Sequence, residues 1–411
     1  MLKRIRIQRF KSLSDVEVHL PKLAVLFGPN AAGKSNLLDA VQVLSRIAAS
    51  RTISDALSEP IRGYPVEAFA FPAGGLAALL SSPLATFSIE ADVACGKDLF
   101  RYRVEVGIQP ASGSLSVQDE YLATLSRKGD PKGNPSIEKV DAQLRIRRKS
   151  RPAHPRQETV GLNHALLSDP RLSGIEYRPI ERCRNELAGW KCYYLDPRVA
   201  MRSARPPADV RDIGVLGEDI APFLYRLRGE HPRHFEAVKR ALRSLVPSVE
   251  DLTVDLDKRR GTLDIQVRQA GTDYSSRIVS EGTLRVLALC AIAVNPWSGA
   301  LLAFEEPENG VHPRRLELIV ELLCSLAIEQ GRQLLVTTHS PLLCDALLRR
   351  ARAHPKDIAL LRVRQGATGT EVAPFDVTGP LFKDQEIASA LTATAEDGLF
   401  EGLMLRGMLD G

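Results

Sequence analysis

A glycine-rich segment near the N-terminus limits, more than any other feature, how this chain of 411 residues can fold. The segment is Gly28-Pro29-Asn30-Ala31-Ala32-Gly33-Lys34-Ser35, which fits the pattern G-x-x-x-x-G-K-[ST]. Residues 23–27 before it are all apolar, and the residues after it place leucine and valine side chains on one helical face. A strand, a glycine turn and a helix in this order predict a buried strand of an α/β fold.

This segment has the composition of a phosphate-binding loop. Its glycines let the backbone curl so that successive N–H groups face an anion, and the following helix adds partial positive charge. Lys34 can reach the outer phosphates of a nucleotide, and the Ser35 hydroxyl can ligate Mg²⁺. We therefore predict that residues 28–35 bind phosphate. A glycine-rich turn that fits the pattern by chance is the alternative.

Two adjacent acids follow a second apolar strand, which is predicted over residues 300–304. The carboxyl edge of a parallel sheet is where α/β proteins bind ligands, so Glu305 and Glu306 are candidate site residues. Glu305 would hold Mg²⁺, directly or through water, and Glu306 would be the general base for an attacking water. An acidic turn between strand and loop is the alternative interpretation.

A histidine follows a third apolar strand, which is predicted over residues 334–338. The His339 imidazole could contact the outermost phosphate or orient a water molecule. A lone histidine at a strand end is more often a polar group with ordinary partners. The neighbouring motifs favour a functional role here.

A serine-glycine turn precedes the apolar helix predicted over residues 286–294. In Ser280-Glu281-Gly282 the hydroxyl, the backbone N–H groups and the helix N-terminus could form a second small anion site. By itself, the segment is better explained by a simple helix N-cap at Ser280.

The rest of the chain indicates how these motifs are organised. Residues 2–8 alternate apolar and basic side chains and predict an edge strand, and alternation over 85–125 predicts antiparallel strands. Residues 126–175 are rich in Lys, Arg, Pro, Ser and Gly and predict an exposed insertion or loops, whereas 215–247 have helical spacing. A helix is predicted after Pro313.

Together, the motifs resemble the ATPase heads of the SMC/RecF/OLD superfamily, of ATP-binding-cassette type. The likeness is closest to small bacterial OLD-like ATPases. It rests on residues 7–13, the continuation Ser35-Asn36-Leu37-Leu38, and the segments 280–285, 304–313 and 338–341. It implies an α/β P-loop NTPase fold with a mixed central sheet, an antiparallel β subdomain and a helical lobe. The expected divisions are 1–84 and 261–345 for the two parts of the head, 85–200 for the β region, 201–260 for the helical lobe and 346–411 for a C-terminal extension.

The resemblance also implies a mechanism. Two heads would sandwich two ATP molecules with Mg²⁺, so that Ser280, Glu281 and Gly282 of one subunit meet the nucleotide bound by the other. Residues 28–36 would bind that nucleotide, Lys11 and Ser12 would touch it, and Ser35 and Glu305 would hold the metal. A solvated edge strand explains Lys11 and Ser12 equally well. The glutamine ligand that such heads carry cannot be assigned.

The pathway implied is DNA maintenance or anti-phage defence. No D-x-D follows His339, so a nuclease of Toprim type would be a separate partner chain. The D-x-D at Asp255-Leu256-Asp257 is better explained as the solvent-exposed face of a strand. A solvated charged loop is the favoured explanation of the basic run, and tracking of DNA phosphates is the alternative; the run comprises Arg145, Arg147, Arg148, Lys149, Arg151 and Arg156. A transporter ATPase and a non-hydrolysing scaffold are the competing functions.

We expect the protein to be cytoplasmic and not to associate with a membrane. No stretch approaches the roughly 18 uninterrupted apolar residues of a membrane span, and six scattered cysteines lack a C-x-x-C pair. A homodimer sandwiching ATP, acting with a separate effector, is the assembly that the resemblance implies. The absence of sustained heptads predicts a head without long coiled-coil arms.

Overall fold

The computed structural model describes residues 1–58, 61–151 and 153–376. The chain divides into two compact units. Unit 1 comprises Met1–Pro21, Gly28–Lys191 and Leu361–Phe375; unit 2 comprises Lys22–Phe27, Cys192–Leu360 and, of the described residues, Asp376. Most of the predicted C-terminal extension, residues 377–411, lies outside the described residues.

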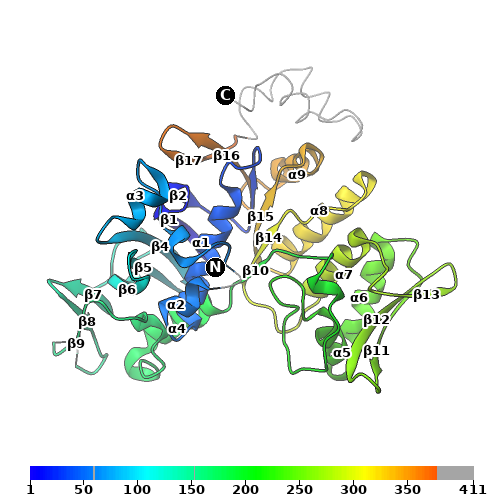
Figure 1. The fold of residues 1–411 in the computed structure, drawn as a ribbon, viewed down its shortest axis with the longest axis horizontal. Helices are drawn as coiled ribbons and strands as arrows, with labels where there is room; N and C mark the ends of the chain where they lie inside the picture. Colours follow the sequence, from blue (N-terminus) through cyan, green and yellow to red (C-terminus); the bar gives the residue numbers. More distant parts are fainter. Residues whose placement is uncertain (59–60, 152, 377–411) are drawn as a thin grey trace. The chain divides into compact units, whose positions relative to one another are not determined.

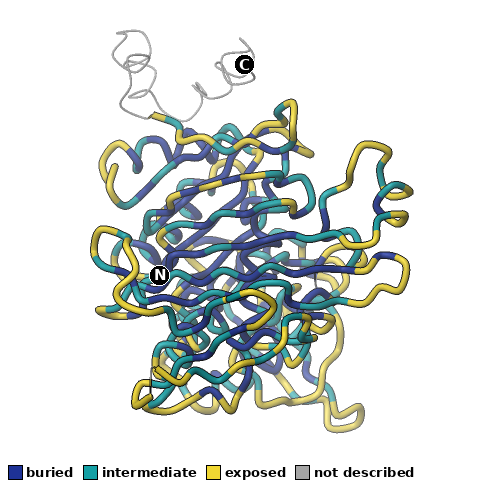
Figure 2. The backbone as a smooth tube through the Cα atoms, turned by 90° about the vertical axis from the view of Figure 1, so that its left-hand side faces the viewer, coloured by how far each residue is buried: buried dark blue, intermediate teal, exposed yellow. Residues whose placement is uncertain are grey.

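An eight-stranded antiparallel sheet forms the centre of unit 1, in the order β2-β1-β4-β5-β6-β7-β8-β9. Strands β4, β5 and β6 have alternating apolar residues. Their antiparallel pairing confirms the strands predicted from 85 to 125. Figure 2 shows buried residues along the strands and exposed residues gathered in the connecting loops. The strands are β1 (Leu2–Phe10), β2 (Leu13–His19), β4 (Ala85–Cys95), β5 (Asp98–Gln109), β6 (Ser114–Leu125), β7 (Ile137–Val140), β8 (Gln143–Ile146) and β9 (Arg156–Thr159).

The prediction that residues 2–8 form an edge strand is wrong. Strand β1 lies between β2 and β4 and pairs with both. Its basic side chains are tolerated inside the sheet because acids on the neighbouring strands face them. Arg4 bonds Glu17 at 2.7 Å and Glu90 at 2.7 Å, and Arg6 bonds Asp15 at 2.8 Å.

The prediction of loops over 126–175 is also wrong in part, because strands β7, β8 and β9 lie within this range. The buried side chains Ile137, Leu144 and Ile146 hold this extension of the sheet together. They are few and widely spaced among polar residues, so the strand pattern was hidden by the composition. Short 3₁₀ helices at Leu166–Ser168 and Ile175–Tyr177 complete the segment.

The principal helix of unit 1 is α1 (Lys34–Ala49), which begins directly after the phosphate-binding loop and is buried on most sides. It packs against α4 (Arg178–Ala188), as Figure 1 shows. A hairpin made by the end of β16 (Ile358–Gly366) and by β17 (Gly369–Pro374) also belongs to this unit, and β17 packs beside β2. The remaining helices are α2 (Ile53–Leu57), a 3₁₀ helix at Pro65–Ala68 and α3 (Gly75–Leu80).

Unit 2 contains the parallel strands β14 (Leu301–Glu305), β15 (Gln333–Thr338) and β3 (Leu23–Phe27), side by side in that order. Strand β10 (Lys191–Tyr193) flanks β14, and the first residues of β16 flank β3. All three parallel strands are almost entirely buried, as continuous apolar runs require. The strands predicted at 22–27, 300–304 and 334–338 are therefore confirmed.

Helices and a small sheet make up the rest of unit 2. Helices α5 (Ile220–Glu230) and α6 (Pro232–Leu245) confirm the predicted helical region and pack on the three-stranded sheet β11-β12-β13 (Figure 1). Asp255 is exposed in β11 (Asp251–Asp257), as the strand interpretation of that motif predicted. Strands β12 (Thr262–Gln269) and β13 (Thr272–Ser275) complete this sheet.

The remaining helices of unit 2 follow the functional motifs. They are α7 (Glu281–Ala293), α8 (Leu316–Cys324) with a π-helical continuation at Ser325–Glu329, α9 (Pro341–Ala353) and 3₁₀ helices at Ala200–Arg202 and Pro313–Arg315. Helix α8 buries Leu316, Ile319, Val320 and Leu323, so the helix predicted after Pro313 is confirmed. No helix within the described parts of the chain has the length and apolar character needed to cross a membrane.

Candidate functional site

The phosphate-binding loop, residues 28–35, has the curled backbone that its sequence predicts. Gly28 has φ 153° and Gly33 has φ 100°. A Cβ atom would lie 2.1 Å from the Val363 carbonyl oxygen at Gly28, and 2.1 Å from the Thr370 Oγ1 at Gly33. Only glycine fits at either position, because both the backbone angle and the neighbouring atoms exclude a side chain.

Lys34 folds back over this loop. Its Nζ donates to the carbonyl oxygens of Gly28 and Pro29, at 2.9 Å each, and the residue is only 5% exposed. A buried ammonium at the mouth of a ring of backbone N–H groups is the arrangement that binds the phosphates of a nucleotide. Ser35 follows it in the first turn of α1.

A hydrogen-bonded chain fixes the loop to two distant segments of unit 1. The Asn36 Nδ2 donates to the Ser12 Oγ at 2.8 Å, and the Ser12 Oγ lies 2.7 Å from the Thr370 Oγ1. Thr370 in turn donates to the carbonyl of Ala32 at 3.0 Å. Ser12 therefore lies beside the loop, and its hydroxyl already has protein partners; its contact with nucleotide stays a prediction.

Lys11 is held by a buried acid, so the interpretation of it as a solvated surface residue is wrong. Its Nζ lies 2.7 Å from the Asp39 Oδ2, and Asp39 is fully buried in α1. Arg62 bonds the same carboxylate at 3.0 Å. Because Asp39 is shared by two cations, Lys11 and Arg62 are fixed close to the start of α1.

A cavity of about 650 Å³ adjoins this cluster. Its walls combine the side chains of Lys11, Arg62 and Ser12 with aromatic rings and glycine backbone. Phe71 is half-exposed there, and Phe69 is buried. The lining of this cavity includes Lys11, Ser12, Arg62, Phe69 and Phe71. The volume falls within the range of small-molecule sites.

The acidic and histidine motifs lie at one edge of the parallel sheet in unit 2. Glu305 pairs with Thr337, and Thr338 pairs with Phe27, so the carboxyl ends of β14, β15 and β3 are level. Phe27 is followed in the chain by Gly28, the first residue of the phosphate-binding loop. The strand register therefore brings the acidic motif, the histidine motif and the end of β3 to the same edge of the sheet.

Glu306 is oriented by three contacts. Its Oε1 lies 2.7 Å from the His339 Nδ1, its Oε2 accepts from the Asn309 Nδ2 at 2.7 Å, and its backbone N–H donates to Thr337 at 3.0 Å. The residue has φ 46°, which is uncommon for a side chain other than glycine. A carboxylate held in this way by a histidine and an amide is suited to accept a proton from water.

Glu308 is a second acid in this loop, and it is only 6% exposed. Burial raises its pKa, while a hydrogen bond from the Thr338 hydroxyl opposes the change. Its Oε2 has no hydrogen-bond partner among the described residues. Burial likewise lowers the pKa of Arg285 on α7, with Glu308 the largest opposing charge. Arg285 therefore places a cation from α7 near the acids that follow β14.

The serine-glycine turn caps α7. The Ser280 Oγ accepts from the Thr283 backbone N–H at 3.2 Å and lies 2.8 Å from the Thr283 Oγ1, so the N-cap is present. A Cβ atom at Gly282 would lie 2.0 Å from the Gly310 carbonyl oxygen, which explains the glycine. This contact packs the turn against the loop that carries Glu306 and Asn309.

Two arginines anchor the same turn. The Arg198 Nε bonds both carboxylate oxygens of Glu281, at 3.0 and 3.1 Å, and Arg202 donates to the carbonyl of Val279 at 2.7 Å. Glu281 is thereby held outward as a partner of Arg198. These two arginines could not be predicted from the motif, because they lie some 80 residues earlier in the chain.

Sequence reasoning found Ser12, Asn36, Glu306 and His339, and the structure brings each against another polar group of its own unit. It missed Asp39, Arg62 and Thr370 around the loop, and the roles of Glu308 and Asn309. The last two stand within three residues of Glu306, so their proximity was a usable signal. Thr370 carried none, since it lies 358 positions from its partner Ser12.

The donor set suits Mg²⁺ together with a nucleotide. Within the described part of the chain, no three His, Cys, Asp or Glu side chains gather closely enough to hold a metal ion on their own. Mg²⁺ is commonly bound by one or two protein oxygens, substrate phosphates and water. One hydroxyl at Ser35 and one carboxylate at Glu305 match that pattern.

A family comparison decides the class of protein. The profile of AAA_21, described as "AAA domain, putative AbiEii toxin, Type IV TA system", matches residues 23–345. The chain belongs to the AAA_21 family. It is thus a P-loop protein of the nucleotide-binding ATPase class. A comparison with curated proteins gives no significant match.

Solved structures of SMC heads share the fold of this AAA_21 chain. One is the SMC head bound to the C-winged helix domain of ScpA, with TM-score 0.54 and 14% identity over 93% of this chain and 99% of that one. Another is an SMC head with an extended coiled coil, bound to the C-terminal domain of ScpA from Pyrococcus furiosus. It has TM-score 0.53 and 12% identity over 95% and 99% of the chains. The predicted fold class is confirmed, and the OLD-like branch stays a prediction.

Proposed function

We propose that this chain binds ATP with Mg²⁺, hydrolyses it, and acts as a nucleotide-dependent dimeric switch. The observation that carries the proposal is the position of Glu306. It is held by His339 and Asn309 where β14 ends, at the sheet edge where β3 continues into the phosphate-binding loop. An acid poised in this way is suited to activate water beside a bound triphosphate.

Each residue has a role in this proposal. The loop N–H groups and Lys34 bind the outer phosphates, and Ser35 and Glu305 hold Mg²⁺, which neutralises phosphate charge when bound. Glu306 takes the proton of the attacking water, and His339 orients the Glu306 carboxylate. The base and ribose lie in the cavity beside Lys11 and Ser12, where Phe71 offers a ring for stacking.

The second half of the site comes from a second copy of the chain. Ser280 and Gly282 of one subunit face the outermost phosphate held by the other, and Glu281 stabilises the turn through Arg198. The Ser280 hydroxyl accepts the N-cap bond and can still donate to phosphate when Thr283 donates to it. Hydrolysis then releases the outermost phosphate, which is the group that both subunits contact.

We further propose a separate effector partner and a role in defence or DNA maintenance. The family description names a toxin of a type IV toxin–antitoxin system, and the two SMC heads are described as bound to a domain of ScpA. Both descriptions fit an ATPase head that controls another protein. A Toprim-like nuclease is the effector that the OLD-like resemblance suggests. The proposed location is the cytoplasm.

The substitution Lys34→Ala tests nucleotide binding directly. Loss of one charge-assisted contact to phosphate costs about 1.5–3 kcal/mol, so we expect ATP affinity to fall about 10- to 100-fold. Titration calorimetry with Mg·ATP measures this, with Lys22→Ala as the control, since Lys22 pairs with Asp357 on the surface. Undiminished ATP binding by Lys34→Ala would remove the phosphate assignment, and absence of turnover in the parent chain would favour a scaffold.

A further inference from the structure

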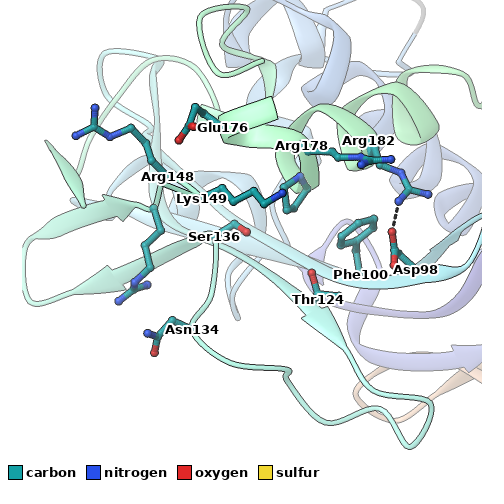
Figure 3. A pocket seen from close by; sticks show the side chains of 12 residues that line it. Asp98, Phe100, Thr124, Asn134, Ser136, Arg148, Lys149, Glu176, Arg178 and Arg182 are labelled. Carbon is teal, nitrogen blue, oxygen red and sulfur yellow. Dashed lines mark hydrogen bonds and ion pairs between the residues drawn. The ribbon is translucent and has the colours of Figure 1, made fainter. Parts of the chain in front are cut away.

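A second large cavity lies in unit 1, and it shares no residue with the phosphate-binding loop or with the cavity beside Lys11. Its volume is about 530 Å³. The walls come from the starts of β5 and α4, the end of β6, and the segments that flank β7 and β8 (Figure 3). The range 126–175, which carries the basic run, thus contributes part of its lining.

The lining is strongly cationic. Five of its side chains are basic and two are acidic; the basic ones are Arg147, Arg148, Lys149, Arg178 and Arg182. Three of these belong to the basic run seen in the sequence. The structure separates this run into two parts, because Arg156 of the same run pairs with Glu158 away from the cavity.

Internal ion pairs neutralise only part of this charge. Arg147 pairs with Glu138, and Arg182 pairs with Asp98, as Figure 3 shows for the second pair. Among the residues that the structure describes, Arg148, Lys149 and Arg178 form no ion pair. The lining therefore holds an excess of unpaired cations, which an anionic ligand would stabilise.

The other acid of the lining, Glu176, offsets only part of this excess: hydrogen bonds from Ser150, and then the charges of Arg148 and Lys149, lower the pKa of its carboxyl. The Glu176 carboxylate accepts from the Ser150 backbone N–H at 3.0 Å and from the Ser150 Oγ at 2.6 Å. The Nε of Arg148 is buried and lacks a hydrogen-bond partner among the described residues. This leaves a donor in the lining that an acceptor on a ligand can fill.

The remaining walls fit the rest of a nucleotide-sized molecule. Phe100 and Pro179 supply apolar surface, and Thr124, Asn134 and Ser136 supply neutral hydrogen-bonding groups. Lys149 extends from the end of β8 toward the start of α4, where Arg178 lies (Figure 3). A cavity of this volume encloses a small molecule, whereas a nucleic-acid duplex is too wide to enter it.

We propose that this cavity binds a small phosphorylated ligand of nucleotide size. Lys149 and Arg178 would contact the phosphate, and Phe100 and the neutral polar residues would contact the remainder. A free nucleotide and the 5′-phosphate end of a single strand offer the same chemistry. The site is additional to the ATP site, and it gives the inserted strands β7 and β8 a function.

Calorimetry with inorganic pyrophosphate tests this site in the full chain carrying Lys34→Ala, which weakens the phosphate-binding loop. In that background, we expect Lys149→Ala/Arg178→Ala to weaken pyrophosphate binding at least about tenfold, the loss expected for one or two charge-assisted contacts. The matched control is Arg127→Ala/Lys128→Ala, which removes two exposed cations outside the cavity and should change the affinity less than about twofold.

Three results would overturn the proposal: no pyrophosphate binding to the Lys34→Ala chain, equal losses in the two double variants, or no loss in either. Because the readout is binding in a chain whose loop is disabled, failure here leaves the ATPase proposal standing. Competition then identifies the source of the phosphate. Displacement by AMP alone indicates a free nucleotide, and displacement by a short 5′-phosphorylated oligothymidylate indicates a strand end. Equal displacement by the unphosphorylated oligonucleotide would contradict phosphate recognition.

Discussion

Replacement of Glu306 by glutamine should reduce the rate of ATP hydrolysis about 10²- to 10⁴-fold, the range typical of a lost general base. The amide keeps the shape of the side chain and can still bond His339 and Asn309, which now hold the carboxylate. It cannot accept a proton from water. ATP binding should stay within about twofold of the parent, because the phosphate contacts are made by the loop.

Steady-state phosphate release and nucleotide titration on the same preparations separate these effects. Glu321→Gln is a suitable control, since Glu321 is an exposed acid on α8 that pairs with Arg350 at 3.3 Å. Its turnover should equal that of the parent. Full turnover by Glu306→Gln would remove the general base from the account, whereas loss of ATP binding would show a structural role instead.

Two substitutions at Ser280 should separate its N-cap role from its proposed role toward the partner's nucleotide. Ser280→Asp keeps a good N-cap but brings a carboxylate against phosphate, so turnover should fall about hundredfold with stability nearly unchanged. Ser280→Ala removes the cap and should cost about 1 kcal/mol of the free energy of unfolding. Chemical denaturation and phosphate release measure the two quantities.

The pattern of results distinguishes the two roles. A serine that serves only as the N-cap would leave Ser280→Asp fully active and folded. A serine that faces phosphate gives an inactive, stable aspartate variant. Thr283→Val is the matched control for the neighbouring hydroxyl, because it removes the Thr283 Oγ1 contact but leaves the backbone N–H that Ser280 accepts.

The parts of the site that could be predicted are those formed by residues adjacent in sequence. The loop, the acids after β14 and the histidine after β15 are each specified by adjacent residues, and parallel strands bring their ends level. Contacts between distant segments could not be predicted in this way. Thr370 bonds the carbonyl of Ala32, which lies 338 positions earlier in the chain. Lys11 bonds Asp39 from a turn in which Lys11 itself has φ 50°.

The errors in fold have the same origin. Residues 2–8 look like an edge strand because arginines alternate with apolar residues, and only the acids of β2 and β4 make this pattern tolerable inside a sheet. Residues 137–146 look like loops because two short strands carry few apolar residues. Their stability comes from the sheet that they extend, which local sequence does not describe.

Mixing two inactive chains tests the central claim, that each triphosphate is enclosed by the loop of one subunit and the serine turn of another. Lys34→Ala and Ser280→Asp chains are combined in equal amounts, and phosphate release is measured against each chain alone. Random pairing gives mixed dimers with one intact site, so turnover should recover to about a quarter of the parent value. If the mixture stays as inactive as its two components, the shared site is contradicted.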